Sequence, residues 1–367
     1  MSGQLEHHLA ELRQQGEFDS EGFFTIDLKR GQRLTLDLLR AQPFYWLVKL
    51  VQAAVRLGAP AVQIRNQAHT THLAFATTQA LPPASRLAST RTTELSESFV
   101  ATMARQHQHY RWTVLGEHSE WLTFGNEQSH HGRIDRQEAD QLRQTFGLGS
   151  SPSAVLVEQT RPEPKVGFWA RVFARGCHAA DETRELCHAC CLCPIPVYLD
   201  GRNLATGRAP YHPIPLFGLY EAPGGFRVDP QGTPFDQGGR QLIQEWVSRG
   251  GEAEPGLCRL ALTAPEVPGG PQIVWFVGHG VLLHGYRADL GYPGAAAIVD
   301  LEGLKTDATS MQVVRDEAFD RLLHHLRERL AQTVRAGLDR AAANQWLGSR
   351  ALRTIEERCP AAVRPEA

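Results

Sequence analysis

The chain has 367 residues, of which 42% are apolar and 21% charged, and its formal net charge is −2. At roughly 150 residues per domain, this length predicts two or three domains of ordinary globular composition. The slight negative charge argues against a dedicated nucleic-acid surface, which is usually basic. The sequence has no apolar run of the ~18 residues that a membrane helix needs. Residues 1–16 have no apolar signal-peptide core. We therefore expect a cytoplasmic protein that binds neither nucleic acid nor membranes.

The first 66 residues predict short alternating helices and strands. Residues 3–15 and 29–39 have helical apolar spacing, and residues 23–26 between them form an expected strand. The clearest helix covers residues 42–58, because Leu47, Leu50, Val51 and Ala54 recur at the spacing of one helical face. Gly58 ends this helix, and the next strand begins at residue 61.

The pattern then predicts a strand at residues 72–77, a helix at 92–109 and a hairpin. The strands of that hairpin are residues 110–115 and 120–124, joined by a turn at 116–119. Residues 126–132 are polar and are expected to form a loop. A helix at 134–146 and a strand at 153–159 complete this part of the chain.

Two prolines at residues 161–164 predict a domain boundary, because proline interrupts regular structure. The expected domains are residues 1–160 and 161–345, followed by a tail at 346–367. The second domain should contain a helical region to residue 189, a cysteine-rich turn and an irregular stretch at 209–239. Its other strands are expected at residues 195–199, 257–262, 272–277 and 295–299. A helix at 316–343 carries an apolar stripe that could also pair two copies of the chain.

The helix, glycine and strand at residues 42–66 resemble the nucleotide-binding unit of the GHKL ATPases: gyrase, the heat-shock chaperone, histidine kinases and MutL. A weaker similarity covers residues 182–199, where Cys193-Pro194-Ile195 resembles the junction that opens the chaperone's middle domain. Residues 298–319 are similar to part of the family's transducer domain. The resemblance implies an α/β (α+β) two-layer sandwich followed by a second, transducer-like α/β domain.

The family's catalytic residues are absent at the matching positions. The family helix carries Glu, Asn and Asp at i, i+4 and i+7, whereas this chain has Lys49, Ala53 and Arg56. A charged lysine cannot accept a proton from water, and alanine has no ligand atom for Mg²⁺. In the family, an adenine-binding Asp-x-Gly-x-Gly motif and a glycine-rich lid occupy the segment that matches residues 76–98. In this chain that segment contains no glycine. The resemblance thus implies a degenerate site at which ATP and Mg²⁺ are disfavoured.

Lys49, Gln52 and Arg56 allow two interpretations. They could form a solvated helical face opposite the apolar stripe, as charged helical faces usually do. They could instead line a remodelled pocket and bind an anion or a nucleotide, since Lys49 and Arg56 lie two turns apart on one face. The sequence leaves both open.

The cysteines also allow two interpretations. Cys187 and Cys190 have the spacing of a zinc knuckle, and Cys177 and Cys193 could complete four ligands. No second knuckle of recognised spacing follows, so the thiols could instead fill the core as small apolar groups.

These observations predict a non-catalytic, chaperone-like protein that acts in protein interaction or regulation. One alternative is an ATPase whose nucleotide contacts have moved to unrecognised residues. Another is an interaction module stabilised by zinc.

Overall fold

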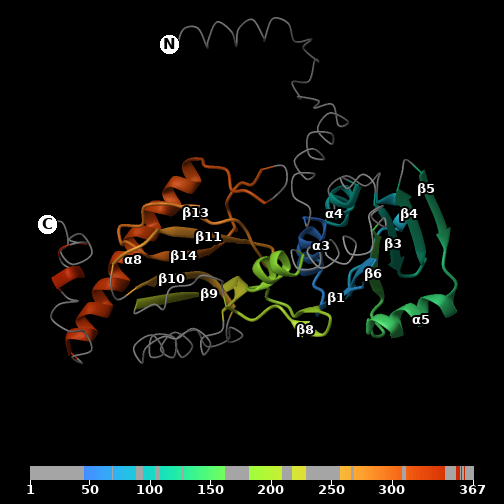
Figure 1. Cartoon of the computed structure of the whole chain (residues 1–367), viewed down its shortest axis with the longest axis horizontal. Helices are drawn as coiled ribbons and strands as arrows, with labels where there is room; N and C mark the ends of the chain where they lie inside the picture. The colour runs from blue at the N-terminus through green and yellow to red at the C-terminus, as the bar shows by residue number, and fades with distance from the viewer. Residues whose placement is uncertain are drawn as a thin grey trace, which may run out of the picture.

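The computed structural model describes residues 45–67, 69–87, 94–103, 108–125, 128–161, 182–208, 217–228, 257–265, 268–307, 311–343, 353–355, 357 and 359. The helices expected at 3–15 and 29–39, the strand at 23–26 and most of the tail lie outside these residues. Two sheets stand next to one another along the long axis of the molecule (Figure 1). The mixed α/β class predicted from the sequence is confirmed.

The first sheet has eight strands, and all its neighbouring strands are antiparallel except β1 and β7. In spatial order the strands are β5 (Gln128–Arg133), β4 (Glu120–Gly125), β3 (His109–Leu115), β6 (Ser153–Thr160), β2 (Thr70–Thr77), β1 (Val62–Asn66), β7 (Val197–Leu199) and β8 (Arg202–Asn203).

Helix α3 (Tyr45–Arg56) leads into β1 through a glycine cap. Gly58 has a φ of 67°, in the left-handed region that glycine adopts without a Cβ penalty. The Ala59 amide donates to the Ala54 carbonyl at 2.9 Å, and the Gly58 amide donates to the Val55 carbonyl at 3.1 Å. These two bonds form a Schellman motif, which satisfies carbonyls at the helix end. The helix–glycine–strand unit predicted from the sequence is confirmed.

The two faces of the first sheet have different covers, because side chains alternate between faces along each strand. Helices α3 and α4 (Glu94–Met103) pack on one face. Their docking includes edge-to-face aromatic contacts of Trp46 with Tyr110 at 5.5 Å and of Phe99 with Trp112 at 5.6 Å. Helix α5 (Arg136–Phe146) packs at one end of the other face, over a smaller core that includes Ala154.

The second sheet has six strands and is covered by one long helix. The strands are β12 (Val281–Leu282), β11 (Ile273–Gly278), β14 (Ala296–Asp300), β10 (Leu257–Ala264) and β9 (Phe217–Arg227), with β13 (Tyr286–Arg287) paired to β11. Helix α8 (Glu317–Ala343) buries Phe319, Leu326, Leu330 and Val334 in the main core. A dimer through α8 would therefore have to use its exposed face rather than this stripe.

Sheet membership changes beyond the predicted domain boundary. Strands β7 and β8 follow residues 161–164 in the sequence, yet they extend the first sheet through the parallel pairing of β7 with β1. The main hydrophobic core also continues from α3 to α8 without interruption. The change from one sheet to the other falls between Asn203 and Phe217, so the predicted boundary does not coincide with it.

Two expected loops are wrong. Residues 126–132 contain most of β5, whose side chains are largely exposed because it is an edge strand, so no apolar alternation reveals it. The stretch 209–239 contains β9, a strand whose sequence includes Pro223, Gly224 and Gly225 and whose pairing with β10 is irregular. Among the residues that the structure describes, no helix combines the length and apolar character that crossing a membrane requires.

Candidate functional site

Helix α3 lies at the junction of the two sheets, where it contacts α4, β2 and β12. The α3 face that carries Lys49 and Gln52 is directed towards this junction. Lys49 is 5% exposed and Gln52 is 4% exposed, whereas Arg56 is exposed. The interpretation as a solvated face is therefore wrong for Lys49 and Gln52 and holds only for Arg56.

Lys49 is held between α3 and α4. Its Nζ lies 3.6 Å from Oε2 of Glu97, and its backbone carbonyl accepts a hydrogen bond of 3.0 Å from Oγ of Ser98. Burial lowers the pKa of the Lys49 ammonium, and the carboxylates of Glu97 and Asp307 partly oppose that effect. The carboxylates of Glu97 and Asp307 thus offset part of the cost of burying the Lys49 charge.

Gln52 joins α3 to the second sheet. Its Nε2 donates a 3.0 Å hydrogen bond to the carbonyl of Gly278, where β11 turns into β12. In this turn His279 has a φ of 50° and Gly280 a φ of 77°, as in the two-residue hairpin turns that match the twist of the strands. A two-residue hairpin turn thus links β11 to β12, and it packs directly against α3.

Charged groups from both sheets surround this junction. The pKa of His279 is lowered by burial and then by the positive charges of Arg56 and Lys49, while Asp300 and Glu97 oppose the shift. Ala53 is 1% exposed in the same helix and belongs to the main core. Packing, the Lys49–Glu97 ion pair and the Gln52–Gly278 hydrogen bond therefore occupy this face of α3.

We expect the two partners of the Lys49–Glu97 pair to respond differently to substitution. Glu97→Gln should lower the free energy of unfolding by about 1–2 kcal/mol, because it leaves a buried ammonium beside a neutral side chain. The loss is smaller than for a fully buried pair, because water screens the half-exposed Glu97. Lys49→Met should be neutral or stabilising, since Glu97 can be hydrated. Urea denaturation at pH 7 measures both, and a larger loss for Lys49→Met than for Glu97→Gln would contradict this view of the pair.

The lowered pKa of Lys49 also fixes the sign of a pH effect. The unfolded chain holds this proton more tightly, so the contribution of Lys49 to the free energy of unfolding rises with pH from its folded pKa towards the ordinary lysine value. In the Lys49→Met variant, the free energy of unfolding should therefore rise less steeply over that alkaline pH range.

Two of the four candidate zinc ligands, Cys190 and Cys193, are buried in the core. Cys177 lies outside the described residues, and Cys187 is partly exposed. Cys190 and Cys193 belong to the main core, and burial raises the pKa of both thiols, that of Cys193 to about 12. Zinc binds thiolates, which burial disfavours here. Within the described part of the chain, no three His, Cys, Asp or Glu side chains form a group that could hold a metal ion.

Cys190→Ala should lower the free energy of unfolding by about 1 kcal/mol, as expected for a small buried side chain in a packed core. A chelator should leave the melting temperature of the native protein unchanged. Thermal denaturation with and without EDTA checks this. A large drop in melting temperature with EDTA would instead support the alternative in which zinc stabilises an interaction module.

Sequence reasoning missed two parts of the junction. The spacing of residues in α4 does not reveal that Glu97 pairs with Lys49. Nor does the sequence pattern show that His279 lies at this junction. The left-handed conformation of His279 is visible only in the structure. Sequence reasoning also missed the histidine-bearing face of β3 and β5, because β5 was taken for a loop.

No protein-family model matches the sequence, and a comparison with curated proteins finds no match. Among solved structures, the chain is similar to the crystal structure of the B-subunit of the DNA gyrase from Myxococcus xanthus. The TM-score is 0.43 and the sequence identity 12%, over 82% of this chain and 96% of that one. A likeness this distant carries neither a nucleotide nor an activity over to this chain.

Proposed function

We propose that this chain is a non-catalytic, GHKL-like α/β protein that acts through interaction with other proteins. The observation that carries the proposal is the state of Lys49: its side chain is buried on α3 and lies 3.6 Å from Glu97. The helix that resembles a nucleotide-binding helix serves here to join two sheets.

The chemistry of hydrolysis supports the same conclusion. A water-activating group must accept a proton, and a magnesium site needs oxygen ligands. On α3, Lys49 and Ala53 offer neither. Gln52 has an oxygen, but its amide is tied to the Gly278 carbonyl in the second sheet. A nucleotide approaching this face would have to break the Gln52 hydrogen bond and the Lys49–Glu97 pair.

The rival ATPase function predicts turnover, and our proposal predicts none. Steady-state phosphate release from Mg-ATP by the purified chain should stay at the background of a heat-denatured sample. Calorimetric titration with Mg-ATP should show no saturable heat. Turnover that disappears in the Lys49→Ala variant would show that α3 has a catalytic role and would overturn the proposal.

A further inference from the structure

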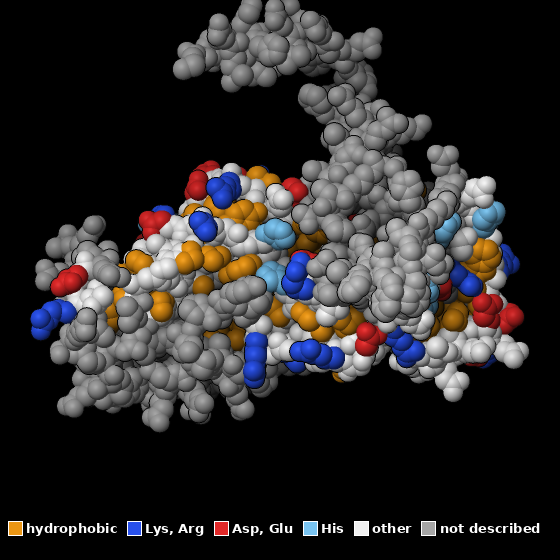
Figure 2. All heavy atoms as spheres, viewed as in Figure 1, with side chains coloured by type: hydrophobic (Ala, Val, Ile, Leu, Met, Phe, Trp, Pro, Cys, Tyr) orange, Lys and Arg blue, Asp and Glu red, His pale blue; other side chains and the backbone are white. Residues whose placement is uncertain are grey.

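A cavity of about 410 Å³ lies on the face of the first sheet that is opposite to α3 and α4. Its lining comes from β3, β4, β5 and β6 and includes His109, Gly125, Gln128, His130, Glu158 and Thr160. Helix α5 covers only the other end of this face. Histidine side chains gather on the surface at this end of the sheet (Figure 2). The volume falls within the range of small-molecule sites.

The strand registers place polar side chains in neighbouring rows on this face. Thr160 lies opposite His109, Gly125 opposite Gln128, and Thr123 opposite His130. Alternate residues of a strand share a face, so these pairs belong to one surface. Between α5 and the strand ends, the described residues that these strands place on this surface are polar or glycine, whereas the same strands are apolar under α5. Tyr110 and Phe124 also belong to the lining of the cavity.

Gly125 forms the floor of the cavity. A Cβ at this position would lie 2.4 Å from Nδ1 of His109, so the imidazole of His109 leans over the glycine. His130 and Gln128 stand on the next strand, on the other side of Gly125. The missing side chain of Gly125 thus makes room for the His109 imidazole, which borders a trough whose other border is formed by the polar side chains of β5.

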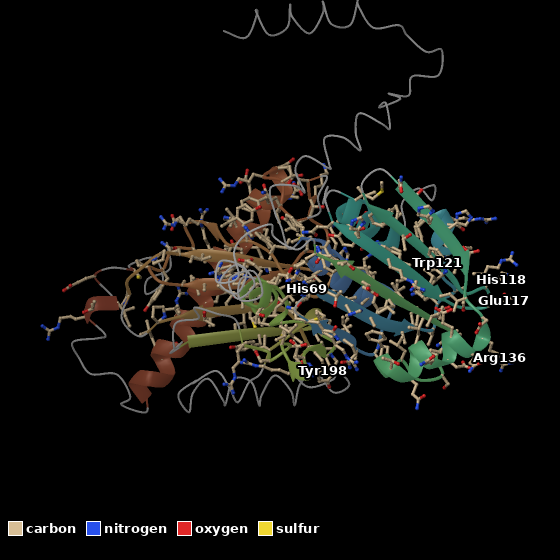
Figure 3. The ribbon with its side chains drawn as sticks, turned by 45° about the vertical axis from the view of Figure 1, so that its right-hand side comes forward. His69, Glu117, His118, Trp121, Arg136 and Tyr198 are labelled. Atoms are coloured by element: carbon tan, nitrogen blue, oxygen red, sulfur yellow. The ribbon has the colours of Figure 1, made fainter. Side chains whose placement is uncertain are left out.

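Trp121 marks the end of this trough that is nearer to α5. In Figure 3 it lies on β4 near the β3–β4 turn, which carries Glu117 and His118. The guanidinium of Arg111 lies 5.5 Å from the centre of the Trp121 ring, and its Nη2 is 3.3 Å from Oε1 of Glu138. Arg111 is therefore engaged at the α5 end.

Side chains that can donate hydrogen bonds line the other end of the trough. Imidazole, amide and hydroxyl groups come from His109, His130, Gln128 and Thr160. The carboxylate among the lining residues is that of Glu158, which lies 3.9 Å from Nδ1 of His72 at the margin. When both imidazoles are protonated, all their nitrogens donate, and charge-assisted bonds to the acceptor oxygens of a ligand are the strong ones.

We propose that this trough is a binding site for a small anion bearing a carboxylate or phosphate group. The anion lies in the cavity between His109 and His130 and accepts hydrogen bonds from both imidazoles. The site is separate from α3, so it does not depend on the proposed absence of nucleotide hydrolysis.

Titration of the full chain with inorganic phosphate and, separately, with succinate tests the proposal. The measurement is calorimetric and is made at pH 6, because histidine gains its positive charge just below neutral pH. We expect saturable millimolar binding of at least one probe. The probe that binds more tightly identifies the anionic group.

His130→Glu should weaken that binding roughly tenfold or more, because it replaces a donor by a like charge. The matched control is His131→Glu, which puts the same charge on the adjacent exposed residue of β5, on the opposite face of the sheet. Its affinity should stay within about twofold of that of the unmodified chain.

Three results would overturn the site. The first is no saturable binding of either probe. The second is an equal loss in both variants, which would show non-specific attraction. The third is unchanged affinity in His130→Glu. Circular dichroism of both variants confirms that folding is retained.

Discussion

Arg161→Met should lower the free energy of unfolding by about 3–5 kcal/mol, the cost of leaving a buried charge without its partner. Nη2 of Arg161 donates to Oε2 of Glu182 and also to Thr71 and Asn66. Glu182 is 3% exposed at the start of the helix at residues 182–190. The pair joins the end of β6 to that helix, so its loss removes a positively charged partner from a buried carboxylate.

Two further variants make this prediction specific. Adding Glu182→Met to Arg161→Met should recover much of the loss, because the buried negative charge is then removed as well. Arg184→Met is the exposed control, since the Arg184 side chain is 72% exposed and its Nε lies 4.0 Å from Oε1 of Glu185. We expect it to change stability by less than about 0.5 kcal/mol. An Arg161→Met variant as stable as Arg184→Met would contradict a structural role for the pair. Urea denaturation gives all three values.

Gly280→Ala should lower the free energy of unfolding by about 2–4 kcal/mol, combining a left-handed backbone with a steric clash. Gly280 has a φ of 77°, and a Cβ there would lie 2.6 Å from Cδ of Pro194 and 3.0 Å from Cγ2 of Val55. The clash falls where the β11–β12 turn meets both α3 and the cysteine-rich turn.

Gly291→Ala separates the two causes. Gly291 has a φ of 79°, but a Cβ there meets nothing within 4 Å. This variant should lose only the backbone part, about 1–2 kcal/mol. Equal losses for Gly280→Ala and Gly291→Ala would mean that the turn does not pack closely on α3. Thermal denaturation of the two variants decides between these outcomes.

The fold was predictable where one local rule decides the structure. α3 shows its apolar face through Leu47, Leu50 and Val51, and Gly58 has the conformational freedom that its cap requires. The β3–β4 hairpin was likewise evident from two aromatic-rich runs and a short polar turn. β5 was missed because its side chains face solvent on an edge strand, so the pattern carries no information about burial.

The site was less predictable, because burial on α3 comes from elements distant in sequence. Lys49 and Gln52 look like a polar helical face until α4 supplies Glu97 and the β11–β12 turn supplies the Gly278 carbonyl. Gln52 and Gly278 are 226 residues apart, and helical spacing holds no trace of such a pairing. Arg56, at the exposed end of the helix, was described correctly by the helical pattern.

We propose that α3 is a structural helix and not a nucleotide site. Hydrogen–deuterium exchange of the α3 amides and of the turn at residues 278–280, with and without Mg-ATP, tests it most directly. Exchange reports local opening, and a ligand bound to the folded state slows it. We expect these amides to exchange at the same rates in both samples. Slower exchange at residues 45–58 or 278–280 in the presence of Mg-ATP would contradict it.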